Sequence, residues 1–230
     1  MPKSVLLIFS LVAFTNSYAQ CTDMDSRAYD SILELTSDSL TKAKAEQMQA
    51  ENPNCWISYN VLGYAHYKDR HYEESEKQLL RARELNPSSR KVLLNLSNTW
   101  VELGKIDSAF HLLNDQIQKN PNDERFITNR GLILKDLHYF DEAKKDLKKA
   151  KRIISDNTTN FNLAILYYEH GKRKKAIRFF KKAFKKDNSD VKSLNYLLEL
   201  YTELDDDKNV AKTKEMIEKV KTGEIPAYRK

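Results

Sequence analysis

Residues 57–87 read ISYNVLGYAHYKDRHYEESEKQLLRARELNP. Apolar and small residues recur in this stretch three or four positions apart, which is the spacing of one helix face and not the alternation of a strand. A polar turn, Asp69 to His71, separates two halves of helical length. Helical spacing places Tyr59, Leu62, Gly63 and His66 on one face of the first half. It places Tyr72, Ser75, Leu79 and Ala82 on one face of the second half. The stretch therefore predicts two helices joined by a tight turn.

The turn that ends this stretch recurs along the chain at a fixed interval. Asn-Pro pairs end at Pro53, Pro87 and Pro121, and each proline lies 34 residues after the one before. Proline-free turns continue the series at residues 155–157 and 187–189. Periods of roughly 20 to 50 residues are typical of solenoids and other repeat arrays. The sequence thus predicts a series of helix pairs.

The repeat resembles that of the tetratricopeptide family. That family has a bulky residue at position four, Leu-Gly at seven and eight, small residues at twenty and twenty-seven, and proline at thirty-two. The repeat that begins at Trp56 matches at Tyr59, Leu62, Gly63, Ser75, Ala82 and Pro87. Further repeats begin at Arg90, Glu124 and Asn157, and a weaker one begins at Val191. The sequence departs from the pattern at His66, where an aromatic residue is usual, and at Arg130, where leucine is usual.

The resemblance implies an all-α fold, a right-handed α-solenoid of helix-turn-helix repeats. Each unit of such an array covers apolar surface that its neighbour leaves bare, and the end units act as caps. We expect a degenerate capping repeat over residues 20–55 and four repeats over 56–190. A degenerate fifth repeat with a capping helix follows over 191–222, and 223–230 form a tail.

Residues 1–19 have the layout of a cleavable signal peptide. Lys3 supplies a positive start, and the apolar run VLLIFSLVAF begins at Val5. Small residues at Ser17 and Ala19 suit cleavage after Ala19. The apolar run is about half the ~20 residues that a membrane-spanning helix needs. We therefore expect an exported protein, periplasmic or extracellular, whose mature chain starts at Gln20.

The two cysteines, Cys21 and Cys55, leave one question open. Export would permit a disulfide between them, since thiols oxidise outside the cytosol. Their spacing puts them in equivalent places of neighbouring repeats, where packed helices lie ~8–10 Å apart. A disulfide needs Cα atoms within about 7 Å, so the bridge forms only if the N-terminal unit departs from regular packing.

The resemblance also implies a binding groove lined by the first helix of each unit. An asparagine recurs at position six in Asn95, Asn129 and Asn162. Such a ladder of amides can pair with the backbone of an extended peptide, because each amide has donors and an acceptor. Asparagine is also common at this position in the family, so the ladder alone does not decide the matter. The residues predicted to line the groove are Asn60, Tyr64, Tyr67, Asn95, Asn98, Arg125, Asn129, Lys135, Phe161, Asn162, Ile165 and Tyr168.

Basic residues gather in the second helices of two repeats of this chain, whose formal net charge is +6. Helical spacing places them opposite the apolar face, on the outer surface. They form either an ordinary solvated face or a contact for anionic lipid or acidic envelope partners. Nucleic acid is not an expected partner, because no aromatic residues for base stacking are interleaved. The predicted basic patch comprises Lys144, Lys145, Lys148, Lys149, Arg152, Lys174, Lys175, Arg178, Lys181, Lys182, Lys185 and Lys186.

No catalytic motif accompanies the repeats. The sequence has no glycine-rich phosphate loop, nucleophile elbow or spaced Cys–His motif. His71, His138 and His170 fall in predicted turns, and Asp205 to Asp207 lack the spacing of a calcium loop. We expect no enzyme activity, cofactor, metal or small-molecule substrate. The predicted function is an exported protein–protein interaction scaffold that binds a protein or peptide in its groove; the alternative is an adaptor that meets an anionic membrane surface through its basic face.

Overall fold

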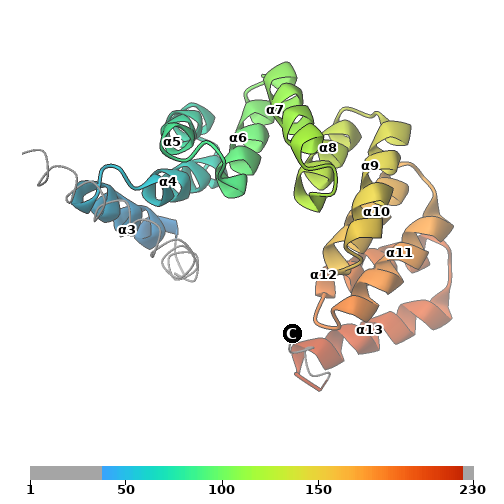
Figure 1. The fold of residues 1–230 in the computed structure, drawn as a ribbon. Helices are drawn as coiled ribbons and strands as arrows, with labels where there is room; N and C mark the ends of the chain where they lie inside the picture. The colour runs from blue at the N-terminus through green and yellow to red at the C-terminus, as the bar shows by residue number, and fades with distance from the viewer. Residues whose placement is uncertain (1–37, 225–230) are drawn as a thin grey trace, which may run out of the picture. The chain divides into compact units, whose positions relative to one another are not determined.

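A computed structural model describes residues 38–224, and this part of the chain is built from α-helices alone (Figure 1). The predicted signal peptide, Cys21 and the first half of the predicted N-terminal repeat lie outside the described residues. The eleven described helices are α3 (Asp38–Glu51), α4 (Trp56–Lys68), α5 (Tyr72–Leu85), α6 (Arg90–Glu102), α7 (Ile106–Lys119), α8 (Glu124–Asp136), α9 (Phe140–Ile153), α10 (Asn157–Glu169), α11 (Arg173–Lys186), α12 (Val191–Glu203) and α13 (Asp207–Lys221).

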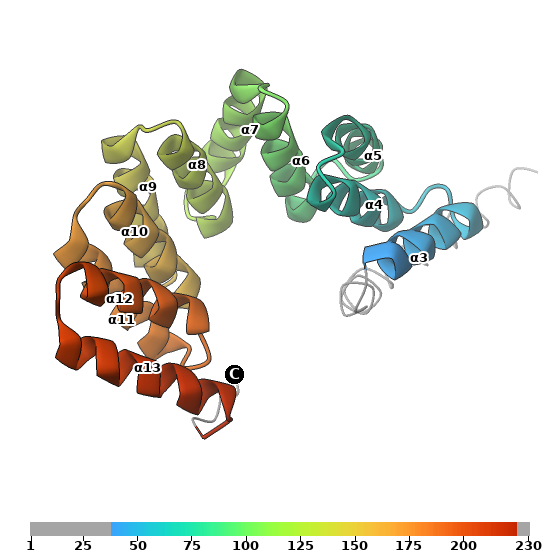
Figure 2. The same ribbon diagram turned by 180° about the vertical axis from the view of Figure 1, so that it is seen from behind.

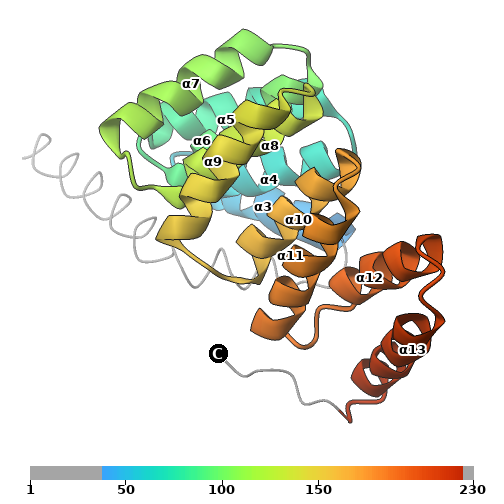
Figure 3. The same ribbon diagram turned by 90° about the vertical axis from the view of Figure 1, so that its right-hand side faces the viewer.

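The helices divide between two compact units whose boundary falls inside α7, after Leu112. In the first unit, α3, α4, α5 and α6 pack in chain order. In the second unit, α8 to α13 form three successive helix pairs, which can be followed by colour in Figure 2. The last pair, α12 and α13, is seen side by side in Figure 3. The all-helical, helix-turn-helix part of the fold prediction is confirmed, whereas the handedness of the array and the assignment of caps stay predictions.

The same tight turn joins the two helices of every pair. Its key residue is the fifteenth of the repeat, and it has a positive φ in all five pairs: Arg70 (63°), Gly104 (71°), His138 (63°), Gly171 (68°) and Asp205 (51°). The N–H of this residue donates to the carbonyl three residues earlier, and the next N–H donates to the carbonyl five residues before it. This pattern closes the end of the first helix as in a Schellman motif. The second helix therefore starts in the same direction each time.

A small buried residue at position eight lets the two helices of a pair cross closely. Ser97, Ala164, Gly63 and Gly131 hold this place in the first four pairs. A methyl group added at Gly63 would stand 2.5 Å from Leu79 Cγ on the facing helix, whereas one at Gly131 would stand 3.1 Å from Leu147 Cγ. The α4–α5 crossing is therefore the tighter of the two.

Arg130, the departure from leucine, belongs to a buried ion pair. Its Nε donates to Asp146 Oδ2 at 2.7 Å, and its Nη2 donates to Asp146 Oδ1 at 2.9 Å. The Asp146 side chain is only 7% exposed. The guanidinium also donates from Nη1 to Asn114 Oδ1 at 2.6 Å. A bidentate pair thus replaces the usual apolar contact between α8 and α9.

The two glycines give a matched test of helix crossing. Alanine in place of glycine gains about 1 kcal/mol of helix propensity, while overpacking a core costs roughly 1–3 kcal/mol. We expect Gly63→Ala to lower the free energy of unfolding, because Leu79 stands too close. Gly131→Ala should be near neutral, since Leu147 has to give by only a few tenths of an ångström. Urea denaturation of both variants measures the difference, and equal losses would contradict the assignment.

The Arg130–Asp146 pair gives a second stability test. Arg130→Ala leaves a buried carboxylate without its cation, a change that typically costs about 3–5 kcal/mol. Replacing both residues, Arg130→Ala with Asp146→Ala, removes the stranded charge and should restore part of the loss. A double-mutant cycle by urea denaturation measures the coupling. The interpretation is wrong if Arg130→Ala alone costs less than about 1 kcal/mol.

Candidate functional site

In the first unit, the first helices α4 and α6 lie side by side and carry five of the predicted groove residues. Tyr64, Tyr67, Asn95 and Asn98 are partly exposed. Asn60 differs, because its side chain is fully buried. Asn95 Nδ2 donates to Asn60 Oδ1 at 3.0 Å, and Asn60 Nδ2 is buried with no hydrogen-bond partner. Asn60 is therefore a structural link between α4 and α6 and does not line an open surface.

In the second unit, the first helices α8, α10 and α12 present partly exposed apolar side chains, which we call the aromatic strip: Leu132, Phe161, Ile165, Tyr168 and Tyr196. Tyr196, on α12, contacts both Phe161 and Tyr168 of α10. Its ring centroid lies 5.8 Å from that of Phe161 and 5.4 Å from that of Tyr168. The strip is thus a continuous apolar surface on α10 and α12.

Two members of the strip were missed in the sequence. Leu132 and Tyr196 occupy positions nine and six of their repeats, which Asn98 and Asn95, two predicted groove residues, occupy in the repeat from Arg90. The predicted groove residues include none from the weaker fifth repeat. Extending the 34-residue period to the repeat from Val191 would have placed Tyr196 in the groove, because it holds position six there.

Polar contacts link the C-terminal ends of the same helices. Lys135 Nζ contacts Glu169 Oε1 at 3.1 Å and Asp136 Oδ1 at 2.6 Å. Burial lowers the pKa of Lys135, but its hydrogen bonds to Asp136 and Glu169 outweigh this effect, and the net shift is upward. Tyr168 donates to Glu199, and this hydrogen bond raises the pKa of Tyr168 to about 12. These contacts hold α8, α10 and α12 in register.

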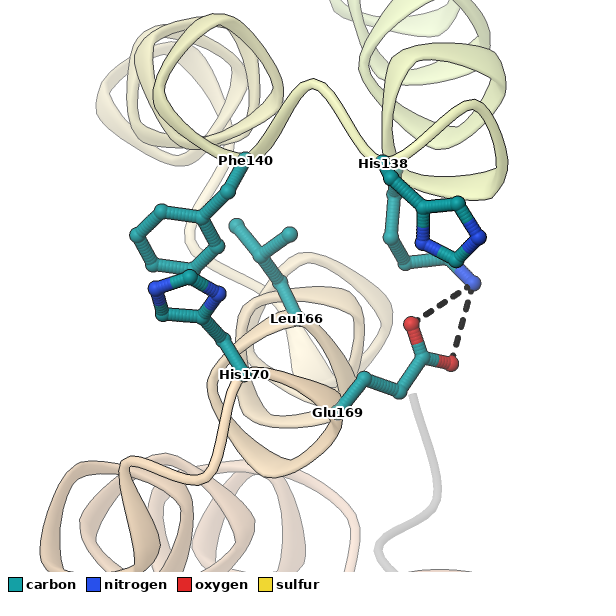
Figure 4. Close-up of a pocket in the computed structure, with 6 residues that line it drawn as sticks. His138, Phe140, Leu166, Glu169 and His170 are labelled. Carbon is teal, nitrogen blue, oxygen red and sulfur yellow. Dashed lines mark hydrogen bonds and ion pairs between the residues drawn. The ribbon is translucent and has the colours of Figure 1, made fainter.

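Beside these contacts lies a small pocket of about 90 Å³ (Figure 4). The ring of His170 stacks on Phe140 with centroids 3.6 Å apart, while His138 lies across the pocket near Glu169. Sites for drug-sized ligands are usually about 300–1,000 Å³. Within residues 38–224 no group of three or more histidine, cysteine or acidic side chains could hold a metal ion. The pocket suits at most one small side chain of a partner.

The remaining groove candidates of the second unit are Arg125, Asn129 and Asn162. Arg125 is exposed at the start of α8, and its Nε lies 3.6 Å from Glu124 Oε1. Asn129 and Asn162 are partly exposed on neighbouring first helices. Asn95, the third member of the predicted amide ladder, lies in the first unit. The described ladder is therefore the pair on α8 and α10.

The predicted basic patch is exposed on α9 and α11. Ten of its twelve side chains are exposed, and only Lys144 and Lys149 are partly buried. The opposite sides of the two helices are buried through residues such as Leu147 and Phe180. Lys144 Nζ and Lys172 Nζ lie 5.0 Å and 4.3 Å from the centroid of the same Phe140 ring. Phe140 thus lies between one patch cation of α9 and Lys172, the residue immediately before α11.

Cys55 is buried immediately before α4 and is not a free thiol. Cys21, its predicted partner, lies outside the described residues, so their pairing stays a prediction. Among residues 38–224, none of the helices combines the length and apolar character needed to cross a membrane.

Comparisons with known proteins agree on the type of repeat. The family model described as "Tetratricopeptide repeat" matches residues 124–157. BBSome complex member BBS4 of Mus musculus is 27% identical over 160 residues, which are 67% of this chain and 30% of that protein. Protein O-mannosyl-transferase TMTC3 of Homo sapiens is 29% identical over 156 residues, which are 66% of this chain and 17% of that protein. The chain thus spans less than a third of the length of these relatives.

Solved structures share the fold at lower identity. TTC0263, a thermophilic TPR protein of Thermus thermophilus, has a TM-score of 0.70 and 20% identity, over 76% of this chain and 96% of that one. PilF of Pseudomonas aeruginosa has a TM-score of 0.64 and 15% identity, over 89% of this chain and 94% of that one. Residues 124–157 therefore match a tetratricopeptide repeat, and the recurring helix pairs around them have the fold of tetratricopeptide repeat proteins.

Proposed function

We propose that this protein is a non-catalytic scaffold that binds an extended segment of a partner protein along the aromatic strip. The observation that carries the proposal is the strip itself: five partly exposed apolar side chains from three successive first helices. A rigid helical framework holds them, so little ordering entropy is lost when a partner binds. Tyrosine is among the residue types that dominate binding energy at protein interfaces, and phenylalanine is enriched at their centres.

The surroundings of the strip suit a peptide in extended form. Asn129 and Asn162 place amide donors and acceptors on α8 and α10, where they can pair with the backbone of a bound segment. Apolar side chains of that segment would then rest on Ile165 and Tyr168. The small pocket beside Glu169 adds room for one further side chain. The chemistry of the strip favours a segment with aliphatic or aromatic side chains. The amide contacts to its backbone do not depend on its sequence.

The absence of an enzyme activity is part of the same proposal. Proteins of this repeat family generally act as scaffolds, and the pocket described above is too small for a typical substrate. The relative TMTC3 is named as a transferase, but the match covers only 17% of its length. The shared region therefore supports the repeat function and not the transfer reaction.

A second surface, the basic face of α9 and α11, supports an additional role toward anionic partners, because its cations are exposed. Export to the periplasm or the cell exterior is a further proposal, which rests on the sequence of residues 1–19. Intact-mass measurement of the secreted protein tests it. A mature chain that starts at Gln20 is expected, and a retained leader would contradict it.

Binding along the strip is tested with peptides selected from a random library on the wild-type protein. Ile165→Glu places a charge at the centre of the apolar surface and should weaken the selected peptides at least tenfold. Lys148→Ala, on the outer side of α9, is the matched control and should leave affinity unchanged. Fluorescence anisotropy measures the dissociation constants, and thermal melts establish that both variants are folded. Peptides that bind all three proteins equally would refute the site.

A crosslinking experiment distinguishes the two surfaces. A photoreactive amino acid in place of Asn129 should capture the selected peptides, whereas one in place of Lys148 should not. Mass spectrometry of the adducts identifies the contact. Capture through position 148 alone would move the peptide site to the outer surface.

A further inference from the structure

The basic face of α9 and α11 has a regular arrangement that ordinary surface charge does not require. Positions 22, 25, 26 and 29 of a repeat lie on the outer side of its second helix. In α9 these positions are Lys145, Lys148, Lys149 and Arg152, and in α11 they are Arg178, Lys181, Lys182 and Lys185. Two neighbouring second helices thus carry cations at the same four positions, in two matching rows.

The other second helices do not share this pattern. The same positions in α5 hold Lys77, Leu80, Arg81 and Glu84; those in α7 hold His111, Asn114, Asp115 and Gln118; and those in α13 hold Lys212, Glu215, Met216 and Lys219. A solvated face in a lysine-rich chain would carry such mixtures throughout. Among the five second helices, only α9 and α11 carry cations at all four positions. This uniform charge therefore marks a distinct surface.

Acidic side chains of the described part pair with none of the eight cations, although the charge of Lys181 adds to the hydrogen bonds of Asn209 in lowering the pKa of Asp206. On the mixed helices, by contrast, Arg81 pairs with Glu84 and Lys219 pairs with Glu215. Like charges four residues apart destabilise a helix. The rows therefore remain free to attract an external array of negative charge.

The chemistry of the surface narrows the partner. None of the exposed large apolar side chains in the described part, Leu80, Tyr139, Ile154 and Leu204, belongs to the rows. A protein interface usually has an apolar centre and is depleted in lysine. Nucleobase stacking needs accessible rings, but Phe179, which lies 5.1 Å from the Arg178 guanidinium and 5.4 Å from Lys182 Nζ, is only 6% exposed. The rows spread positive charge over a surface that has no exposed large apolar side chain, and such a surface suits lipid headgroups.

We propose that the two basic rows dock this protein on an anionic lipid bilayer. The inference deepens the second surface named under the proposed function and does not depend on the aromatic strip. Each lysine or arginine that lies near an anionic leaflet strengthens membrane binding by roughly fivefold. Six lysines and two arginines on rigid helices can meet several headgroups at once, while the first helices of the unit remain available to a peptide.

Vesicle sedimentation tests the proposal with the full chain. Vesicles of phosphatidylglycerol and phosphatidylcholine should bind the protein at low salt, and vesicles of phosphatidylcholine alone should not. The variant with Lys148→Glu, Arg152→Glu, Lys181→Glu and Lys185→Glu should lose at least tenfold in binding. Raising the salt concentration should weaken wild-type binding, because the contact is electrostatic.

The matched control carries the same change of net charge on the mixed helices: Lys77→Glu, Arg81→Glu, Lys212→Glu and Lys219→Glu. It should keep most of the binding, and circular dichroism melts establish that both variants are folded. Equal losses in the two variants would overturn the proposal, since net charge alone would then explain adhesion. No binding to anionic vesicles, or tighter binding to duplex DNA that displaces the vesicles, would also overturn it.

The peptide assay keeps the two proposals apart. A protein that binds selected peptides but not anionic vesicles retains its scaffold function and lacks the lipid contact. If the protein binds vesicles but Ile165→Glu does not weaken peptide binding, the lipid contact stands and the peptide site on the aromatic strip is wrong.

Discussion

The structure depends on one local constraint, the left-handed turn that ends each first helix. A positive φ at the fifteenth residue closes the helix with the same two hydrogen bonds in all five pairs. The next helix then runs back against the small residue at position eight. Adding or removing even one methyl group in a close-packed core lowers the free energy of unfolding. A repeated turn followed by a repeated crossing is therefore enough to fix which face of every helix is buried.

This constraint separates the surfaces of the second unit by helix and by position. Because α8, α10 and α12 all follow the same register, their outward positions meet and form the aromatic strip. The second helices α9 and α11 bury Leu147 and Phe180 in the same manner, and their opposite sides reach solvent. Peptide contact and charge contact can thus evolve on different helices without disturbing the common core.

Much of this was visible in the sequence, and the exceptions have physical causes. The first helices begin at Trp56, Arg90, Glu124, Asn157 and Val191, the residues at which the period places the repeats. A period reports the average environment of a position, and so it assigned Asn60 to an open face. It could not show that Asn95 would cover that side chain. Arg130 looked like a flaw in the pattern because its partner, Asp146, lies on the facing helix and has no fixed spacing in the motif.

The basic rows illustrate what repeats reveal about function. Burial of an apolar side chain contributes roughly 1.5–3 kcal/mol, while repulsion between like charges on a helix costs about 0.2–0.5 kcal/mol per pair. The buried sides of α9 and α11 therefore hold these helices in place whatever their outer positions carry. The mixed residues at the equivalent positions of α5 and α13 show that the fold accepts other choices there. A charge pattern that the fold tolerates but does not need is best explained by what it contacts outside the chain.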